Sequence, residues 1–167
     1  MNNNGVKEND SLVKYGSWSG WEFGSFTSYE ILKNGIINLT VNIAGTAVTL
    51  TDTLSKEEMD KIYKFLNEST GEYESADTMD AGSFIIINGK EYDNCDELNS
   101  NFNDVLDEVL ENHFVFSQES VSHVYDILET NKDIKVSNMT GVNINKMIDD
   151  NNTSNEKVDE VVNTLHK

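Results

Sequence analysis

The chain has 167 residues, of which 37% are apolar, enough for a modest core in one domain or two small ones. It holds 12 lysines, no arginine and 30 acidic residues, so its net charge is −18. This charge excludes a surface that coats nucleic acid or an anionic membrane, because such binding needs many cations. Cys95 is the only cysteine and the polar N-terminus has no signal-peptide pattern, so we expect a cytoplasmic protein.

The first part of the chain predicts an antiparallel sheet. Residues 1–14 are polar and are expected to form a flexible tail. Residues 15–29 hold six of the 15 aromatic side chains, separated by glycine and serine, which favours one or two strands. These aromatics either seal one face of a sheet or form an exposed patch that binds a partner. Trp18 and Trp21 are our candidates for the second role.

Turn signals and period-two patterns continue the sheet. Asn34-Gly35 favours a hairpin, and residues 37–43 then alternate between apolar and polar side chains. Residues 48–51 repeat the alternation. A short apolar run at 84–87 ends at a second Asn-Gly turn. Together these segments predict a meander of strands with a further hairpin later in the chain.

Two amphipathic helices are predicted, one between the fourth and fifth strands and one after the last strand. Ser55 and Glu58 stand three residues apart, as in a capping box, and open a helix with an apolar stripe to Leu66. A second helix is expected over about residues 95–113. The order β-β-β-β-α-β-β-α predicts an α+β domain over residues 15–115, with an antiparallel sheet and helices on one face.

The acidic residues are concentrated in the first part of the chain. The net charge is −17 over residues 1–131 and −1 over residues 132–167. The second helix carries a row of carboxylates opposite its apolar stripe: Asp104, Asp107, Glu108 and Glu111. Such a row is either a solvated face or a surface that docks a basic partner, whose approach it would accelerate. These four residues are our candidates for partner binding.

Residues 116–167 predict a small all-helical domain. Helices are expected at 118–130, at Val136 to Met139, at Met147 and from a capping-box pattern at 153–156 onward. Residues 118–167 resemble a helix-turn-helix module of the bacterial repressor type. The residues that carry the resemblance are 136–147, with Gly141 at the turn.

The helix-turn-helix resemblance implies that Asn143, Asn145 and Lys146 face the major groove of DNA. The segment departs from the family at Asp149 and Asp150, where a basic and an apolar residue are usual. Its charge of −1 also does not favour phosphate contacts. The module therefore either binds operator DNA or contacts a protein.

Other motifs argue against metal or catalytic chemistry. An EF-hand spacing that begins at Asp149 has Ser154 in place of the turn glycine and Lys157 in the loop. Cys95 lies near a helix start but has no candidate base, so a structural thiol is expected. The sequence contains neither a nucleophile elbow nor a phosphate-binding loop. We therefore expect no metal, no cofactor and no enzymatic activity.

The whole-chain layout is similar to bacterial antitoxins and anti-CRISPR-type inhibitors. This resemblance implies a stoichiometric inhibitor that masks a basic, nucleic-acid-binding surface of a target protein, as a nucleic-acid mimic could. Two alternatives remain open. One is a transcriptional regulator with an N-terminal sensing or dimerisation domain, and the other is a toxin immunity protein.

Overall fold

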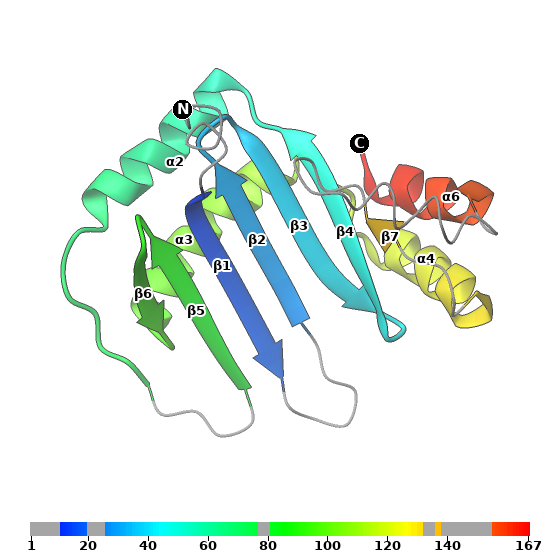
Figure 1. The fold of residues 1–167 in the computed structure, drawn as a ribbon, viewed down its shortest axis with the longest axis horizontal. Helices are drawn as coiled ribbons and strands as arrows, with labels where there is room; N and C mark the ends of the chain where they lie inside the picture. The colour runs from blue at the N-terminus through cyan, green and yellow to red at the C-terminus, as the bar shows by residue number, and fades with distance from the viewer. Residues whose placement is uncertain (1–10, 20–25, 77–80, 132–135, 138–154) are drawn as a thin grey trace, which may run out of the picture.

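The computed structural model describes residues 11–19, 26–76, 81–131, 136–137 and 155–167. These residues form an α+β fold with one sheet in the strand order β6-β5-β1-β2-β3-β4-β7 (Figure 1). The strands are β1 (Ser11–Ser19), β2 (Phe26–Leu32), β3 (Ile36–Ile43), β4 (Thr46–Thr53), β5 (Ala81–Ile87), β6 (Lys90–Asp93) and β7 (Val136–Ser137). The helices are α2 (Lys56–Glu68), α3 (Asp96–Leu110), α4 (Gln118–Thr130) and α6 (Asn155–Leu165).

The six longer strands pair antiparallel, as the sequence predicts, and tight turns fix their register. At the β5–β6 turn Asn88 and Gly89 have φ angles of 51° and 83°. Two successive residues in this left-handed region match the right-handed twist of the flanking strands. At the β2–β3 turn only Gly35 has a positive φ, of 92°. Both Asn-Gly hairpin predictions are therefore confirmed.

The first strand begins earlier than the sequence predicts. β1 starts at Ser11, and the side chains of Leu12 and Val13 are buried. β1 lies between β2 and β5, pairing Val13 with Ile31 on one side and with Ile87 on the other. The prediction of a tail to residue 14 is therefore wrong for residues 11–14, because pairing on both sides overrides their polar composition.

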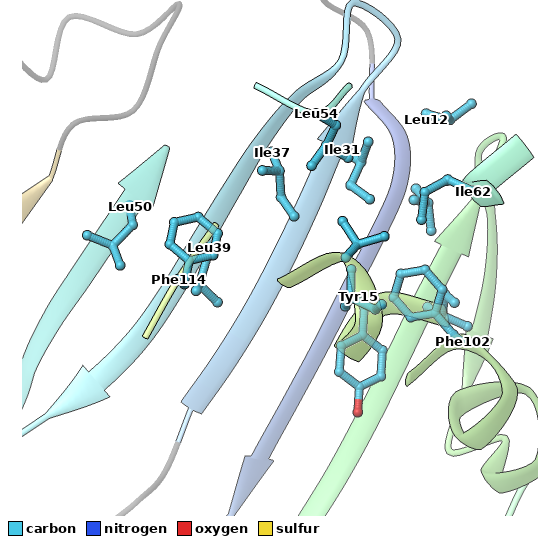
Figure 2. Packing of buried hydrophobic residues seen from close by; sticks show 14 of the residues in the cluster. Leu12, Tyr15, Ile31, Ile37, Leu39, Leu50, Leu54, Ile62, Phe102 and Phe114 are labelled. Atoms are coloured by element: carbon cyan, nitrogen blue, oxygen red, sulfur yellow. The ribbon is translucent and has the colours of Figure 1, made fainter. Parts of the chain in front are cut away.

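One face of the sheet, here called the inner face, carries the core. Cross-strand pairs such as Leu39 with Leu50 and Tyr15 with Ile85 are buried on it. α3 crosses this face behind the strands in Figure 1. The Phe102 ring of α3 lies 5.7 Å from the Tyr15 ring, and Figure 2 shows the two side by side. The prediction of helices on one face is thus confirmed for α2 and α3.

Local chemistry sets the start of α2. The Ser55 side chain accepts a hydrogen bond from the Glu58 backbone N–H at 3.1 Å. The Glu58 carboxylate in turn accepts one from the Ser55 backbone N–H at 2.8 Å. This reciprocal pair satisfies two of the N–H groups that a helix leaves free at its first turn. The predicted capping box is confirmed.

The C-terminal third adds to the same core. Val124 and Leu128 of α4 and Val161 and Leu165 of α6 are fully buried and belong to one hydrophobic cluster with the sheet. The backbone N–H of Val115 donates to the Leu165 carbonyl at 2.7 Å. The proposed boundary at residue 115 therefore does not divide the core of the described residues.

The prediction of a helix at Val136 is wrong. Val136 and Ser137 form β7, which pairs parallel with Val48 and Thr49 of β4. An edge strand such as β4 leaves N–H and C=O groups without sheet partners, and a short added strand satisfies some of them. The helices predicted at 118–130 and at the C-terminus are present as α4 and α6. The helix predicted at Met147 lies outside the described residues.

Within the described part of the chain, no helix has the length and apolar character needed to cross a bilayer.

Candidate functional site

The four acidic candidates share the solvent side of α3. The side chains of Asp104, Asp107, Glu108 and Glu111 are all exposed. Asp104, the neighbours Asp107 and Glu108, and Glu111 follow one another at intervals of one helical turn, so they share one side of the helix. Phe102, Leu106 and Val109 fill the core on the other side. The sequence prediction of an acidic helix face is therefore confirmed in geometry.

One of the four carboxylates has a basic neighbour. The Lys61 ammonium of α2 lies 3.0 Å from Glu108 Oε1. Both side chains are largely exposed, and an ion pair of this kind contributes little stability because water and salt screen it. Glu108 therefore faces α2, and the remaining three carboxylates are the better candidates for contact with another molecule.

A groove of about 530 Å³ lies beside the C-terminal half of α3. Asp107 and Glu111, one turn apart, supply its acidic side, and Tyr29 and Phe116 supply aromatic surface. Thr27, Val41, Leu110 and Phe114 complete the lining. None of these described lining residues is a lysine. The groove thus combines apolar surface with uncompensated negative charge.

The environment of the groove changes the pKa of Tyr29. Burial, the Asp107 carboxylate and the neighbouring Tyr15 raise the pKa of the Tyr29 hydroxyl to about 12. The Tyr15 and Tyr29 rings stack with their centroids 5.9 Å apart. Burial disfavours a charge of either sign here, and the Asp107 carboxylate further disfavours an anion and attracts a cation. A lysine or arginine side chain fits this chemistry, because its stem packs on aromatic surface while its head reaches carboxylates.

The tryptophan candidates do not join this site. Trp18 lies three residues beyond Tyr15 on β1, so it faces the opposite side of the sheet, which we call the outer face. Its side chain is 45% exposed. The aromatic segment therefore divides between the two faces, since Tyr15 and Tyr29 face the core and Trp18 and Phe26 face solvent. Partner binding by the exposed aromatics stays a prediction. Trp21 lies outside the described residues.

The DNA-binding candidates Asn143, Asn145 and Lys146 also lie outside the described residues. What the structure describes of this module is α4, β7 and α6. Because Val136 begins the predicted motif but lies in a strand paired with β4, the motif does not start as a helix.

A polar cluster of Asp52, Glu58, His113 and His166, in which Asp52 remains half-exposed, was not predicted from the sequence. His113 Nε2 lies 2.9 Å from Glu58 Oε1, and His113 Nδ1 lies 2.8 Å from Asp52 Oδ2. Burial opposes protonation of His113, but the hydrogen bonds and charges of Glu58 and Asp52 raise its pKa. His166 Nδ1 lies 3.9 Å from the same Asp52 oxygen, and burial lowers the pKa of this second imidazole.

This cluster is structural in character. It joins the end of β4, the first turn of α2 and the segment after α3, and both nitrogens of His113 are occupied. Within the described residues, no group of three or more histidine, cysteine or carboxylate side chains is arranged to hold a metal ion. No local sequence signal could have identified the cluster, because its members are up to 114 positions apart in the chain, between Asp52 and His166.

Cys95 is a buried thiol at the N-cap position of α3. Its Sγ lies 3.4 Å from the Asp93 carbonyl oxygen. Burial, followed by the charges of Asp93 and Asp96, raises its pKa. The helix start therefore does not produce a thiolate here. The thiol is buried, and its structural role stays a prediction.

Compared with known proteins, the chain matches no protein-family model and no curated protein sequence. The candidate site is therefore defined by its own geometry: an acidic helix face beside a groove of aromatic and carboxylate side chains, in an α+β fold.

Proposed function

We propose that this chain is an acidic binding protein that docks through α3 on a basic surface of a target protein and masks it. The observation that carries the proposal is the placement of Asp107 and Glu111 in a groove with Tyr29 and Phe116. If the carboxylates of α3 served only to keep the protein soluble, exposed charge would be sufficient. A groove with aromatic lining additionally offers a place for the stem of a bound basic side chain.

Charge supports the same partner. The chain carries a net charge of −18, and every ionisable side chain on α3 is acidic. Attraction of this kind accelerates encounter with a basic protein and disfavours nucleic acid as a direct ligand. A target whose basic surface normally holds nucleic acid fits best, because carboxylates on a rigid helix can occupy positions that phosphates would take.

The first experiment is an affinity capture from a nuclease-treated bacterial lysate, eluted along a salt gradient. Three baits are compared: the unmodified protein, a site variant with Asp104, Asp107 and Glu111 all changed to lysine, and a control variant. The control carries Glu119→Lys, Asp126→Lys and Asp159→Lys, which are exposed positions on α4 and α6. Both variants change the net charge by the same amount.

The proposal expects one basic protein in stoichiometric amount with the unmodified bait and with the control, and its loss from the site variant. Nucleic acid added back should compete with this capture. Retention of the protein by all three baits would place the contact elsewhere. Binding to DNA with a steep salt dependence, and no captured protein, would favour the transcriptional regulator instead.

A further inference from the structure

The outer face of the sheet carries a second feature that the proposed function does not use. Four apolar side chains gather on β1, β2 and β5, and we call them the outer patch: Trp18, Phe26, Phe84 and Ile86. Trp18 and Phe26 are directly paired across the strands and are 45% and 40% exposed. Among the described helices, α2 and α3 pack on the inner face, so they do not cover this patch.

Glycine lets two aromatic rings of the outer patch lie close to the sheet. Phe84 lies opposite Gly16 across the β1–β5 pair, and a Cβ at Gly16 would fall 2.4 Å from the Phe84 ring. Trp18 lies opposite Gly82, where a Cβ would fall 2.2 Å from the indole. Each aromatic ring therefore packs against the glycine backbone of the neighbouring strand. An apolar sheet face is suited to packing against another sheet, since sheets stack face to face about 10 Å apart.

Charges of both signs border the patch: Lys14 on β1, which also pairs with Glu30 of β2, and Glu91 and Asp93 on β6. Lys14 on β1 and Glu91 on β6 both pair with Ile86 of β5, so they flank it in a single row. One groove of about 470 Å³ includes all three residues together with Trp18 and Phe84. A hydrogen bond and the charge of Asp93 raise the pKa of Glu91, so these neighbouring carboxylates repel. An added cation would relieve this repulsion.

We propose that the outer patch is the interface of a homodimer, and that its occupant is a second copy of this chain. A two-fold axis running along β5 brings Lys14 of each copy opposite Glu91 of the other. The same axis brings the two Phe84 and Ile86 side chains together at its centre. Such an interface is self-complementary, as a two-fold contact must be.

The fold also keeps the carboxylates of α3 out of this interface. The carboxylates of α3 lie on the other side of the sheet from the outer patch, so in the dimer the two acidic faces point away from each other. The dimer would thus present two acidic surfaces in opposite directions. Dimerisation does not depend on the identity of any target, so its failure and the failure of the proposed function are separately observable.

Sedimentation velocity across the micromolar range tests the proposal. The unmodified protein should sediment as a dimer, and Trp18→Ala should weaken the dimer by about tenfold or more, as loss of an aromatic anchor does. Tyr125→Ala is the matched control, because Tyr125 on α4 is 46% exposed. It should leave the dimer unchanged. Circular dichroism confirms that each variant is folded.

Charge exchange tests the two-fold pairing itself. Lys14→Glu should weaken the dimer, because it places carboxylates opposite one another. The double variant Lys14→Glu with Glu91→Lys should restore it. A monomeric unmodified protein at every concentration would overturn the proposal, as would a dimer that persists in Trp18→Ala. Failure of the double variant to recover would overturn the pairing of Lys14 with Glu91.

Discussion

His113 Nε2 lies 2.9 Å from the Glu58 carboxylate, which ties the segment after α3 to the first turn of α2. The other ring nitrogen, Nδ1, lies 2.8 Å from Asp52 of β4. A protonated imidazole can donate to both carboxylates at once, whereas a neutral one can donate to only one. The positive charge of His166, when present, opposes this protonation. The stability of the fold should therefore depend on pH.

We expect the free energy of unfolding to be largest between about pH 4.5 and 6.5, which are the ordinary pKa values of Glu58 and His113. Burial opposes ionisation of Glu58, but hydrogen bonds from Ser55, His113 and Asn112 lower its pKa to about 2. Its contribution is present above pH 4.5 and is lost as pH falls toward 2. The pKa of His113 is raised, so its contribution is present below pH 6.5 and is lost as pH rises through the folded value.

Urea unfolding followed across this range measures the effect. His113→Gln should remove the decline on the alkaline side and lower the free energy of unfolding by roughly 2 kcal/mol near pH 6, because the buried Glu58 carboxylate and the half-exposed Asp52 carboxylate lose a charged donor. His123→Gln is the control, since its 3.1 Å contact with Glu160 is exposed. An equal alkaline decline in His113→Gln would show that another group governs it.

The capping box of α2 should contribute measurably to stability. Ser55→Ala removes the oxygen that accepts from the Glu58 backbone N–H. We expect a loss of about 1 kcal/mol in the free energy of unfolding, measured from the urea midpoint at constant slope. Ser100→Ala, at an exposed position within α3, should change it by less than about 0.5 kcal/mol. Similar losses in both variants would argue against a specific cap.

The contact between Gly82 and Trp18 should appear as a coupling between the two positions. Gly82→Ala places a methyl group where the indole now lies, so the ring must move. We expect a loss of about 1–3 kcal/mol in the free energy of unfolding, as in other overpacked sites, with a change in tryptophan fluorescence. In the Trp18→Ala background the same change should be nearly neutral. Additive effects in a double-mutant cycle would contradict the contact.

Cys95 should resist thiol reagents in the folded protein. Burial limits access to its Sγ, and the raised pKa keeps it protonated near neutral pH. Its reaction with a disulfide reagent should be slow in buffer and fast in denaturing urea. Rapid labelling without denaturant would indicate an exposed thiolate and contradict the placement at the N-cap of α3.

Local signals in the sequence determined much of the fold. The Asn88-Gly89 turn, the Ser55–Glu58 capping box and the apolar stripe of α3 each depend on residues a few positions apart, so one sequence suffices to find them. The acidic face of α3 follows from the same helical spacing. These features are set by backbone preferences and by short-range hydrogen bonds.

Pairing between strands far apart in the chain determines the features of the fold that the sequence did not predict. Polar composition at residues 11–14 indicates a tail, but hydrogen bonding to β2 and β5 makes them part of a strand. The sequence around Val136 predicts a helix, but Val136 instead pairs with the edge strand β4. Such outcomes depend on partners tens of residues away, which no local pattern contains.

The candidate site likewise has features that the sequence predicts and features that depend on the tertiary structure. The order of residues is enough to predict that α3 carries a row of carboxylates and that the neighbouring strands are rich in aromatics. Only the tertiary structure placed Tyr29 and Phe116 beside Asp107, and Trp18 on the opposite face. The physical reason is that side chains alternate along a strand, so the face that the core covers decides which aromatics are buried and which remain exposed.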